Sequence, residues 1–266
     1  MKTMTRELIS GTSKDGVGYI WNSIRNWKGS DTAVFVHGMC GSMVQFLRWL
    51  EVCALWEIPA YAIDLRGGKA LEDCSLELYE QNILGFVFGI ECERVSLIGH
   101  SMGAPLCMNV SWQCPNVKTM ISLMSAPLAG MLPTFAILHR ILRWQYLQAI
   151  CGNSPFSLHS DDAEFFLRGA DSNNHTMFRP ESGRVVRELI RGIRVRREIP
   201  CRHYLFSGTW DAAAPPRQQK RIAARLGLSE WDIFQIACGH MPMLEEKADR
   251  HLEFILSASS FLSRLP

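Results

Sequence analysis

The stretch Val95-Ser-Leu-Ile-Gly99-His-Ser101-Met-Gly103 decides how the rest of the chain is interpreted. The apolar run that opens it is typical of a strand buried on both faces, and a helical pattern follows Gly103. The pattern Gly-x-Ser-x-Gly alone arises by chance in about one chain in ten of this length. Between a buried strand and a helix, however, it predicts a strained turn that exposes the Ser101 hydroxyl above the helix N-terminus. Ser101 is therefore the first candidate for a nucleophile.

Strands and helices alternate on both sides of this stretch. The segments predicted to be strands are 5–9 and 17–21, which form a hairpin around Asp15-Gly16, and then 33–36, 60–63, 95–98, 120–124, 204–206 and 233–236. The alternation predicts an α/β fold with a mostly parallel sheet and helices on both faces. Functional sites of such sheets lie beyond the carboxyl ends of the strands.

Two residues downstream of Ser101 stand at strand ends, where they could complete a catalytic triad. Asp211 follows the predicted strand 204–206, and His240 follows the predicted strand 233–236. A serine hydroxyl is a weak nucleophile that needs a histidine base and a carboxylate to orient that base. The order Ser, Asp, His is the one that accompanies this kind of serine turn. Singly, each could be an ordinary turn or loop residue; together they predict the triad Ser101–His240–Asp211.

A glycine-containing loop, His37-Gly38-Met39-Cys40-Gly41, follows the first buried strand. Acyl transfer needs two N–H donors directed at the developing oxyanion, one from the residue after the nucleophile and one from an upstream loop of this kind. The pattern assigns these roles to the backbone N–H groups of Met102 and Met39. His37 and Gly38 are expected to contribute to the binding site, with a simple tight turn as the alternative interpretation.

The segment 128–198 interrupts the alternation, because it shows helical periodicity and no convincing strand. We expect it to be a helical cap, inserted after the sixth strand into a core formed by residues 1–127 and 199–266. A helix over 132–150 would gather one apolar stripe, made of Phe135, Leu138, Leu142 and Tyr146. The stripe is predicted to line a substrate pocket, although it also suits packing of the cap onto the sheet. The arginine-rich stretch 184–197 suits either an anion-binding site or a solvated helix face.

These motifs resemble those of the α/β-hydrolase fold family over essentially the whole chain. The resemblance rests on the segments His37–Gly41, Asp64–Gly67, Gly99–Gly103, Gly208–Pro215 and Gly239–Glu245. It implies an eight-stranded, mostly parallel sheet, a helical cap, and Ser101, His240 and Asp211 as nucleophile, base and acid. The cap segment is similar to that of capped bacterial members called lysophospholipase-like or esterase-like. The chain departs from the family at Gly67-Gly68-Lys69, where relatives often carry Gly-His-Gly-x-Ser, so the pocket rim there is expected to differ.

The composition is that of an ordinary globular protein and excludes several classes. The 28 basic and 26 acidic side chains leave a formal charge of +2, which argues against a nucleic-acid surface. Nine cysteines without a CxxC pair are expected to be reduced, mostly buried thiols, and no metal-binding or cofactor motif occurs. No apolar run approaches the roughly twenty residues of a membrane span, and no leader pattern opens the chain. A soluble, cytoplasmic protein is the expectation.

The sequence therefore predicts a serine hydrolase that cleaves an ester or thioester of a hydrophobic acyl group and needs no cofactor. Its partner would be a small-molecule acyl substrate, with no nucleic acid, no transmembrane segment, and a homodimer left open. Because one fold hosts many activities, two alternatives stand beside it. One is an acyltransferase or a cyclising, thioesterase-type enzyme of a biosynthetic pathway that uses the same triad. The other is a ligand receptor with little turnover.

Overall fold

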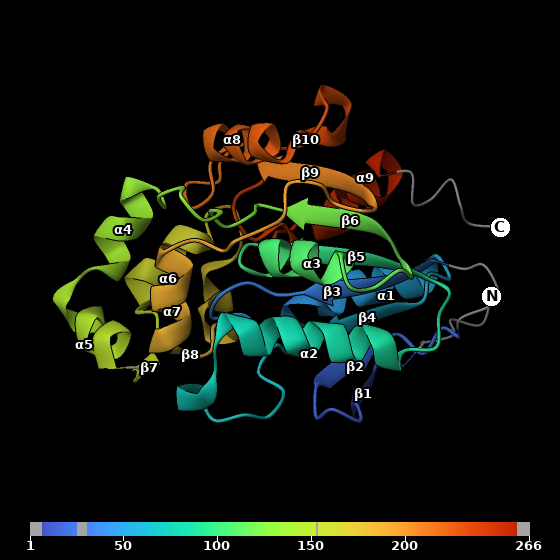
Figure 1. The fold of residues 1–266 in the computed structure, drawn as a ribbon, viewed down its shortest axis with the longest axis horizontal. Coiled ribbons are helices and arrows are strands. Elements are labelled where there is room, and N and C mark those ends of the chain that lie inside the picture. The colour runs from blue at the N-terminus through green and yellow to red at the C-terminus, as the bar shows by residue number, and fades with distance from the viewer. Residues whose placement is uncertain (1–6, 26–30, 153, 260–266) are drawn as a thin grey trace.

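An eight-stranded sheet forms the centre of the molecule (Figure 1). The computed structural model of the chain describes residues 7–25, 31–152 and 154–259. The strands of this sheet are β1 (Ile9–Thr12), β2 (Gly18–Trp21), β3 (Asp31–Val36), β4 (Ala60–Ile63), β5 (Arg94–His100), β6 (Val117–Leu123), β9 (Arg202–Gly208) and β10 (Ile233–Ile236). Their order is β1-β2-β4-β3-β5-β6-β9-β10. Strand β2 pairs antiparallel with β1 and β4, and the other neighbours are parallel, so the predicted mostly parallel, eight-stranded sheet is confirmed.

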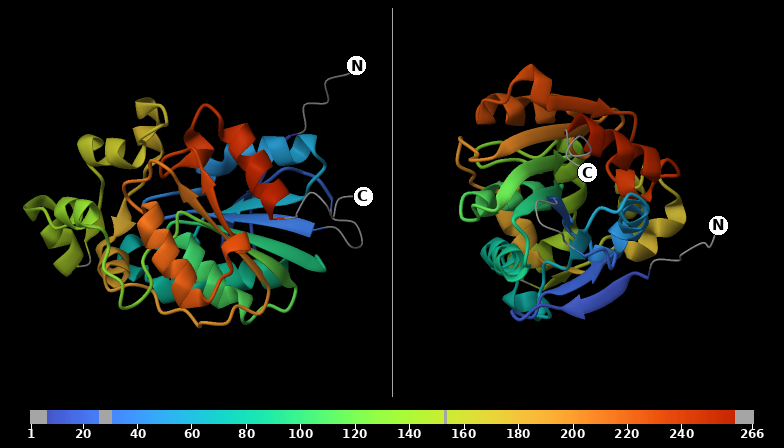
Figure 2. Two further views of the ribbon diagram at one scale, coloured as in Figure 1. Left: turned by 90° about the horizontal axis from the view of Figure 1, so that it is seen from above. Right: turned by 90° about the vertical axis from the view of Figure 1, so that its right-hand side faces the viewer.

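Helices cover both faces of the sheet (Figure 2). On one face lie α2 (Leu76–Gly89), α3 (Gly103–Ser111) and α8 (Pro216–Leu226), and on the other lie α1 (Leu47–Leu55) and α9 (Ala248–Ala258). Alternate residues of a strand point to opposite faces, and both faces of β3 are buried. Val34 and Val36 pack on the α2 side, whereas Ala33 and Phe35 pack on the α1 side. This burial explains why β3 is a continuous apolar run.

The N-terminal hairpin differs from its prediction in the position of its first strand. That strand was expected over residues 5–9, but β1 begins at Ile9; residues 5 and 6 lie outside the described residues. The turn fixes the register, because the Gly16 N–H donates to the Ser13 carbonyl at 3.0 Å and the Val17 N–H to the Ser13 hydroxyl at 3.1 Å. Strand β1 pairs from this turn outward, with Thr12 opposite Gly18.

Between β6 and β9 the chain leaves the sheet, as expected, after the sixth strand. This inserted segment, residues 128–198, contains α4 (Phe135–Ile141), α5 (Trp144–Gly152), β7 (Pro155–Phe156), α6 (Ser160–Phe166), the 3-10 helix η3 (Ser172–Met177), β8 (Glu181–Ser182) and α7 (Gly183–Ile190). Its helices gather at one end of the sheet, on the left in Figure 1. Strands β7 and β8 form a small antiparallel pair, so the expectation of a segment without strands is wrong in this detail.

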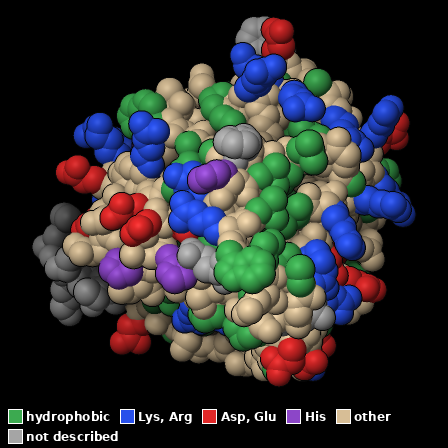
Figure 3. All heavy atoms as spheres, turned by 90° about the vertical axis from the view of Figure 1, so that its left-hand side faces the viewer, with side chains coloured by type: hydrophobic (Ala, Val, Ile, Leu, Met, Phe, Trp, Pro, Cys, Tyr) green, Lys and Arg blue, Asp and Glu red, His purple; other side chains and the backbone are tan. Residues whose placement is uncertain are grey.

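The single helix expected over residues 132–150 is instead two short helices, α4 and α5. The buried carboxylate of Asp162 in α6 contacts both the second helix and the break that precedes it. It accepts a hydrogen bond from the hydroxyl of Tyr146 in α5 at 2.6 Å and one from the guanidinium of Arg143 at the break at 3.3 Å. At the break, Leu142 is 48% exposed. Figure 3 views this end of the molecule and shows hydrophobic side chains gathered across it among Lys and Arg side chains.

Candidate active site

Ser101 stands in a strained turn between β5 and α3. Its φ of +50° lies in the left-handed region, which a serine rarely adopts. The turn is held from both sides, because the Ser101 N–H donates to Leu123 at 2.9 Å and the Ser101 carbonyl accepts from Ala126 at 3.0 Å. A side chain at Gly99 would meet Ala104 at 2.6 Å. The glycines of the motif therefore allow the helix to start directly against the strand, which leaves the serine partly exposed.

Asp211 and His240 form a buried pair at the carboxyl ends of β9 and β10. The Nδ1–H group of His240 donates to Asp211 Oδ2 at 2.8 Å, and Asp211 Oδ1 accepts from the N–H groups of Ala213 and Ala214, each at 2.8 Å. Burial alone would raise the pKa of Asp211, but the charge and hydrogen bond of His240 and the two backbone N–H groups outweigh it and lower this pKa. The ionised carboxylate thus fixes His240 in the tautomer whose Nε2 is free to accept a proton.

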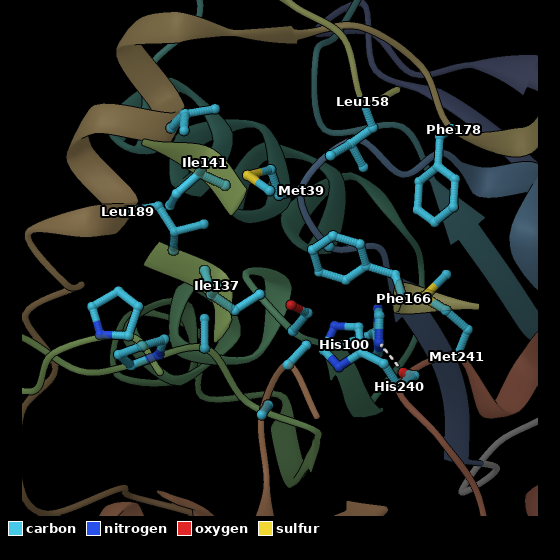
Figure 4. A pocket seen from close by; sticks show the side chains of 18 of the residues that line it. Met39, His100, Ile137, Ile141, Leu158, Phe166, Phe178, Leu189, His240 and Met241 are labelled. Atoms are coloured by element: carbon cyan, nitrogen blue, oxygen red, sulfur yellow. Dashed lines mark hydrogen bonds between the residues drawn. The ribbon is translucent and has the colours of Figure 1, made fainter. Parts of the chain in front are cut away.

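Ser101 and His240 line the same cavity, whose other walls are mainly apolar (Figure 4). Figure 4 shows Ile137, Ile141 and Leu189 on one side of it and Leu158, Phe166 and Phe178 on the other. All six belong to the inserted segment, whereas Gly38, Met39 and Met241 come from the loops that follow β3 and β10. The cavity volume is about 70 Å³. The mainly apolar lining of the cavity suits an apolar chain.

The loop after β3 presses against the serine. A side chain at Gly38 would meet the Ser101 Cβ at 2.8 Å, so only glycine allows this approach. Within the described part of the chain, the N–H groups of Met39 and Met102 have no hydrogen-bond acceptor. The expected oxyanion donors are thus two unpaired N–H groups on the two segments that meet at Ser101.

The inserted segment holds this loop at Cys40, the residue after Met39. Cys40 is buried with a φ of +57°, its carbonyl accepts from the Arg179 N–H at 2.8 Å, and its own N–H donates to Glu181 Oε2 at 3.3 Å. Glu181 is itself fixed, because its Oε1 accepts from the Tyr79 hydroxyl at 2.5 Å. Burial raises the pKa of Glu181. The strained loop is therefore fastened by residues about 140 positions away in the chain.

The apolar stripe predicted to line the pocket needs correction. Leu138, Leu142 and Tyr146 are not among the cavity-lining residues, and α4 contributes Ile137 and Ile141 instead. Tyr146 belongs to α5, where it is buried against Phe156 with its hydroxyl on Asp162. Phe135 begins α4, and its side chain lies outside the described part of the structure. Ile137 with Ile141, and Leu138 with Leu142, form two adjacent apolar rows at the same spacing along α4, so helical periodicity alone did not identify the row that faces the cavity.

His37 is also placed differently from its expected role. It is buried and does not line the cavity, whereas its neighbour Gly38 does. Its Nε2 accepts from the Leu65 N–H at 3.1 Å, and its Nδ1 lies 2.8 Å from the Gly38 carbonyl oxygen. Burial lowers the pKa of His37, so the ring is neutral and joins the loop after β3 to the turn after β4. His37 therefore braces the loop and does not reach a ligand in the cavity.

Sequence reasoning missed several residues of the site. Gln45, His100, Phe166, Phe178 and Met241 line the cavity, and Glu181 fastens the loop. His100 directly precedes the serine in the sequence, but no motif there marks it as a residue that lines the cavity. Gln45 lies only four residues beyond the loop, but nothing in its pattern distinguishes it from a surface glutamine. The contacts of Glu181 and Phe178 are long-range, so no local pattern announces them.

With this geometry in place, the chain can be assigned to a class: it belongs to the alpha/beta hydrolase family, whose family model matches residues 33–253. Ethanol acetyltransferase 1 from Wickerhamomyces anomalus is 31% identical over 96 residues, which are 35% of this chain and 25% of that enzyme. The match thus spans about a quarter of the curated relative.

Solved structures show the same fold at low identity. A lipase-esterase related protein from Clostridium acetobutylicum superposes with a TM-score of 0.67 at 17% identity, over 91% of this chain and 98% of that one. The thioesterase domain from the curacin biosynthetic pathway gives a TM-score of 0.67 at 12% identity, over 94% and 99%. Among the residues that the structure describes, no group of three or more His, Cys, Asp or Glu side chains could hold a metal ion. No helix among them is both long and apolar enough to cross a membrane.

Proposed function

We propose that the chain is a serine hydrolase that cleaves an ester or thioester of a hydrophobic acyl group through an acyl-Ser101 intermediate. One observation carries this proposal: His240, bonded to the buried Asp211, lines the same apolar cavity as Ser101, whose turn exposes it. A base fixed by a carboxylate, in one cavity with a partly exposed serine, is the combination that can activate a hydroxyl for attack.

The proposed reaction begins with attack of Ser101 Oγ on the acyl carbonyl carbon, while His240 Nε2 accepts the hydroxyl proton. Asp211 stabilises the imidazolium that forms. The carbonyl oxygen becomes an oxyanion and accepts hydrogen bonds from the Met39 and Met102 N–H groups. Collapse of this intermediate breaks the bond to the leaving group, which takes the proton from His240. Water, activated by His240 in the same way, then attacks the acyl-enzyme and releases the acid.

In this proposal the inserted segment, residues 128–198, is a cap over the core formed by 1–127 and 199–266. Ile137 and Ile141 supply one wall of the pocket for the acyl chain, and Phe166 and Phe178 supply another. An apolar lining stabilises a bound chain by about 0.8 kcal/mol per buried CH₂ group, which is nearly fourfold in affinity.

An acyltransferase is the second candidate, and the partial match to ethanol acetyltransferase 1 favours it. The acyl-Ser101 step would be the same, but an alcohol would replace water in the second step. Product analysis with and without added ethanol separates the two: a hydrolase forms the free acid, whereas a transferase forms the ethyl ester.

The experiment that tests the hydrolase proposal is kcat/KM across p-nitrophenyl esters of increasing acyl length. We expect a rise of about threefold to fourfold per added carbon from acetate onward, then a plateau once the cavity is full. Ile137→Ala widens the cavity and should move the plateau to longer chains. A profile that is flat or highest for acetate contradicts the hydrophobic-acyl substrate.

A further inference from the structure

Gln45 is a buried polar side chain in an otherwise mainly apolar cavity. It lies in the 3-10 helix η1 (Met43–Phe46), is 2% exposed, and lines the same cavity as Ser101 and His240. Neither its amide nitrogen nor its amide oxygen has a hydrogen-bond partner within the described residues. Leaving a buried amide unpaired is costly, and such groups in native proteins call for an explanation.

A third unpaired atom belongs to His100, a second residue that lines the cavity. Its Nε2 is 2.8 Å from the His240 carbonyl oxygen, which can only accept, so this nitrogen carries the proton. Burial, with the neighbouring His240, lowers the pKa of His100 to about 3, so the ring is neutral and Nδ1 is an acceptor. This Nδ1 also has no partner among the described residues. Two residues that line the cavity therefore carry one amide donor and two acceptors that have no partner within the described residues.

Both groups lie against the loop that presses on the serine. The Gln45 Oε1 atom is 2.7 Å from the position that a Cβ would take at Gly41, and His100 Nδ1 is 3.2 Å from the corresponding position at Gly38. Helix η1 also packs against η5 (Pro242–Leu244), which begins directly after Met241. These unpaired groups therefore flank the reacting end of the cavity and not the distal apolar walls formed by Ile137 and Ile141.

We propose that Gln45 is a specificity-determining residue that binds a hydroxyl or amide N–H group of the substrate close to the scissile carbonyl. Such a group can donate to Oε1 and, as a hydroxyl, also accept from the amide N–H. The preferred substrate is then an acyl ester or thioester with an apolar chain and a hydrogen-bonding group near the reacting bond. This inference rests on the proposed hydrolase function and narrows its substrate class.

Two matched pairs of esters test the proposal and locate the polar group. The acyl pair is p-nitrophenyl butyrate against p-nitrophenyl 3-hydroxybutyrate, and the leaving-group pair is ethyl butyrate against 2-hydroxyethyl butyrate. The readout is the ratio of kcat/KM for the hydroxylated ester to that for the plain one. We expect the wild-type ratio to exceed one in at least one pair and to fall about tenfold or more in Gln45→Met, which keeps the size and removes the amide.

Gln218→Met is the matched control. Gln218 is also buried, and its amide nitrogen also lacks a partner among the described residues, but it lies in α8 and does not line the cavity. Its ratios should equal those of the wild type. Should Gln45→Met lose its fold by circular dichroism, Gln45→Asn withdraws the same amide by one CH₂ group and gives a second measurement of the ratio.

Unchanged ratios in both pairs would overturn the proposal, because Gln45 would then hold only solvent or pack without contacting substrate. This outcome differs from failure of the proposed function. A wild-type protein that cleaves plain esters but shows no Gln45-dependent ratio refutes the inference alone. A wild-type protein that cleaves none of the four esters, in the fold confirmed by circular dichroism, counts against the hydrolase proposal itself.

Discussion

Replacing Gly38 by alanine tests whether the loop after β3 positions an oxyanion donor. The new methyl group would lie 2.8 Å from the Ser101 Cβ and 3.2 Å from His100 Nδ1. Carbon atoms rest at about 3.5 Å or more, so the loop and the serine must separate by about 0.7 Å. Neither atom is the far end of a flexible side chain, because the Ser101 Cβ is fixed by the strained turn. The loop must therefore move, and the Met39 N–H moves with it.

We expect this displacement to lower kcat by about 100-fold, because losing one oxyanion donor costs about 10²- to 10³-fold and a shift of about 1 Å has effects of similar size. The assay is steady-state hydrolysis of p-nitrophenyl butyrate, with the melting temperature measured alongside. Gly89→Ala is the control, since a Cβ there meets nothing within 4 Å. A folded Gly38→Ala protein with kcat within about threefold of the wild type would refute the reasoning.

Three further predictions concern the Asp211–His240 pair, the loop after β3 and the buried His203. Asp211→Asn should lower kcat by up to about 10⁴-fold by disturbing the His240 tautomer. Asp64→Asn, which weakens partly buried ion pairs outside the cavity, should cost far less activity, and the reverse order would exclude Asp211 as the acid. Glu181→Ala should lower kcat about tenfold with little change in KM, because the Cys40 N–H loses its acceptor. Glu181→Gln keeps an acceptor for this N–H and should retain most of the wild-type kcat. Equal losses of kcat in the two variants would argue that Glu181 does not hold the loop in place. Burial lowers the pKa of His203 to about 4. Below about pH 6.5 the unfolded chain therefore takes up a proton that the folded protein does not, and the free energy of unfolding decreases as the pH is lowered. In urea unfolding, His203→Gln should therefore lose about 2 kcal/mol less stability than the wild type between pH 7 and pH 5, and an equal loss would contradict this.

The sequence was most informative where one short motif determines both the backbone conformation and the side chain that this conformation presents. The turn at Ser101 needs glycines on both sides within five residues, so its strained conformation was predictable. The pairing of Asp211 with His240 was predicted because the carboxyl ends of parallel strands lie at one edge of the sheet. The structure places His240 Nδ1 2.8 Å from Asp211 Oδ2.

Packing across long sequence separations was not predictable. The wall of the cavity was assigned to Leu138 and Leu142, but Ile137 and Ile141, one residue earlier in the same helix, line it instead. Both pairs have helical spacing, so periodicity did not distinguish them. The role of Glu181 depends on a contact with Cys40, 141 positions away, and no periodicity carries that information. Helical spacing identifies an apolar face but not the neighbour against which that face packs.

Covalent labelling with a fluorophosphonate tests whether Ser101 is the activated nucleophile. We expect one equivalent to react with the wild-type protein and mass spectrometry to locate it on Ser101. Ser101→Ala should abolish labelling without unfolding the protein, because alanine asks nothing further of the strained turn. A label found on another residue, or labelling that survives in Ser101→Ala, would contradict the account.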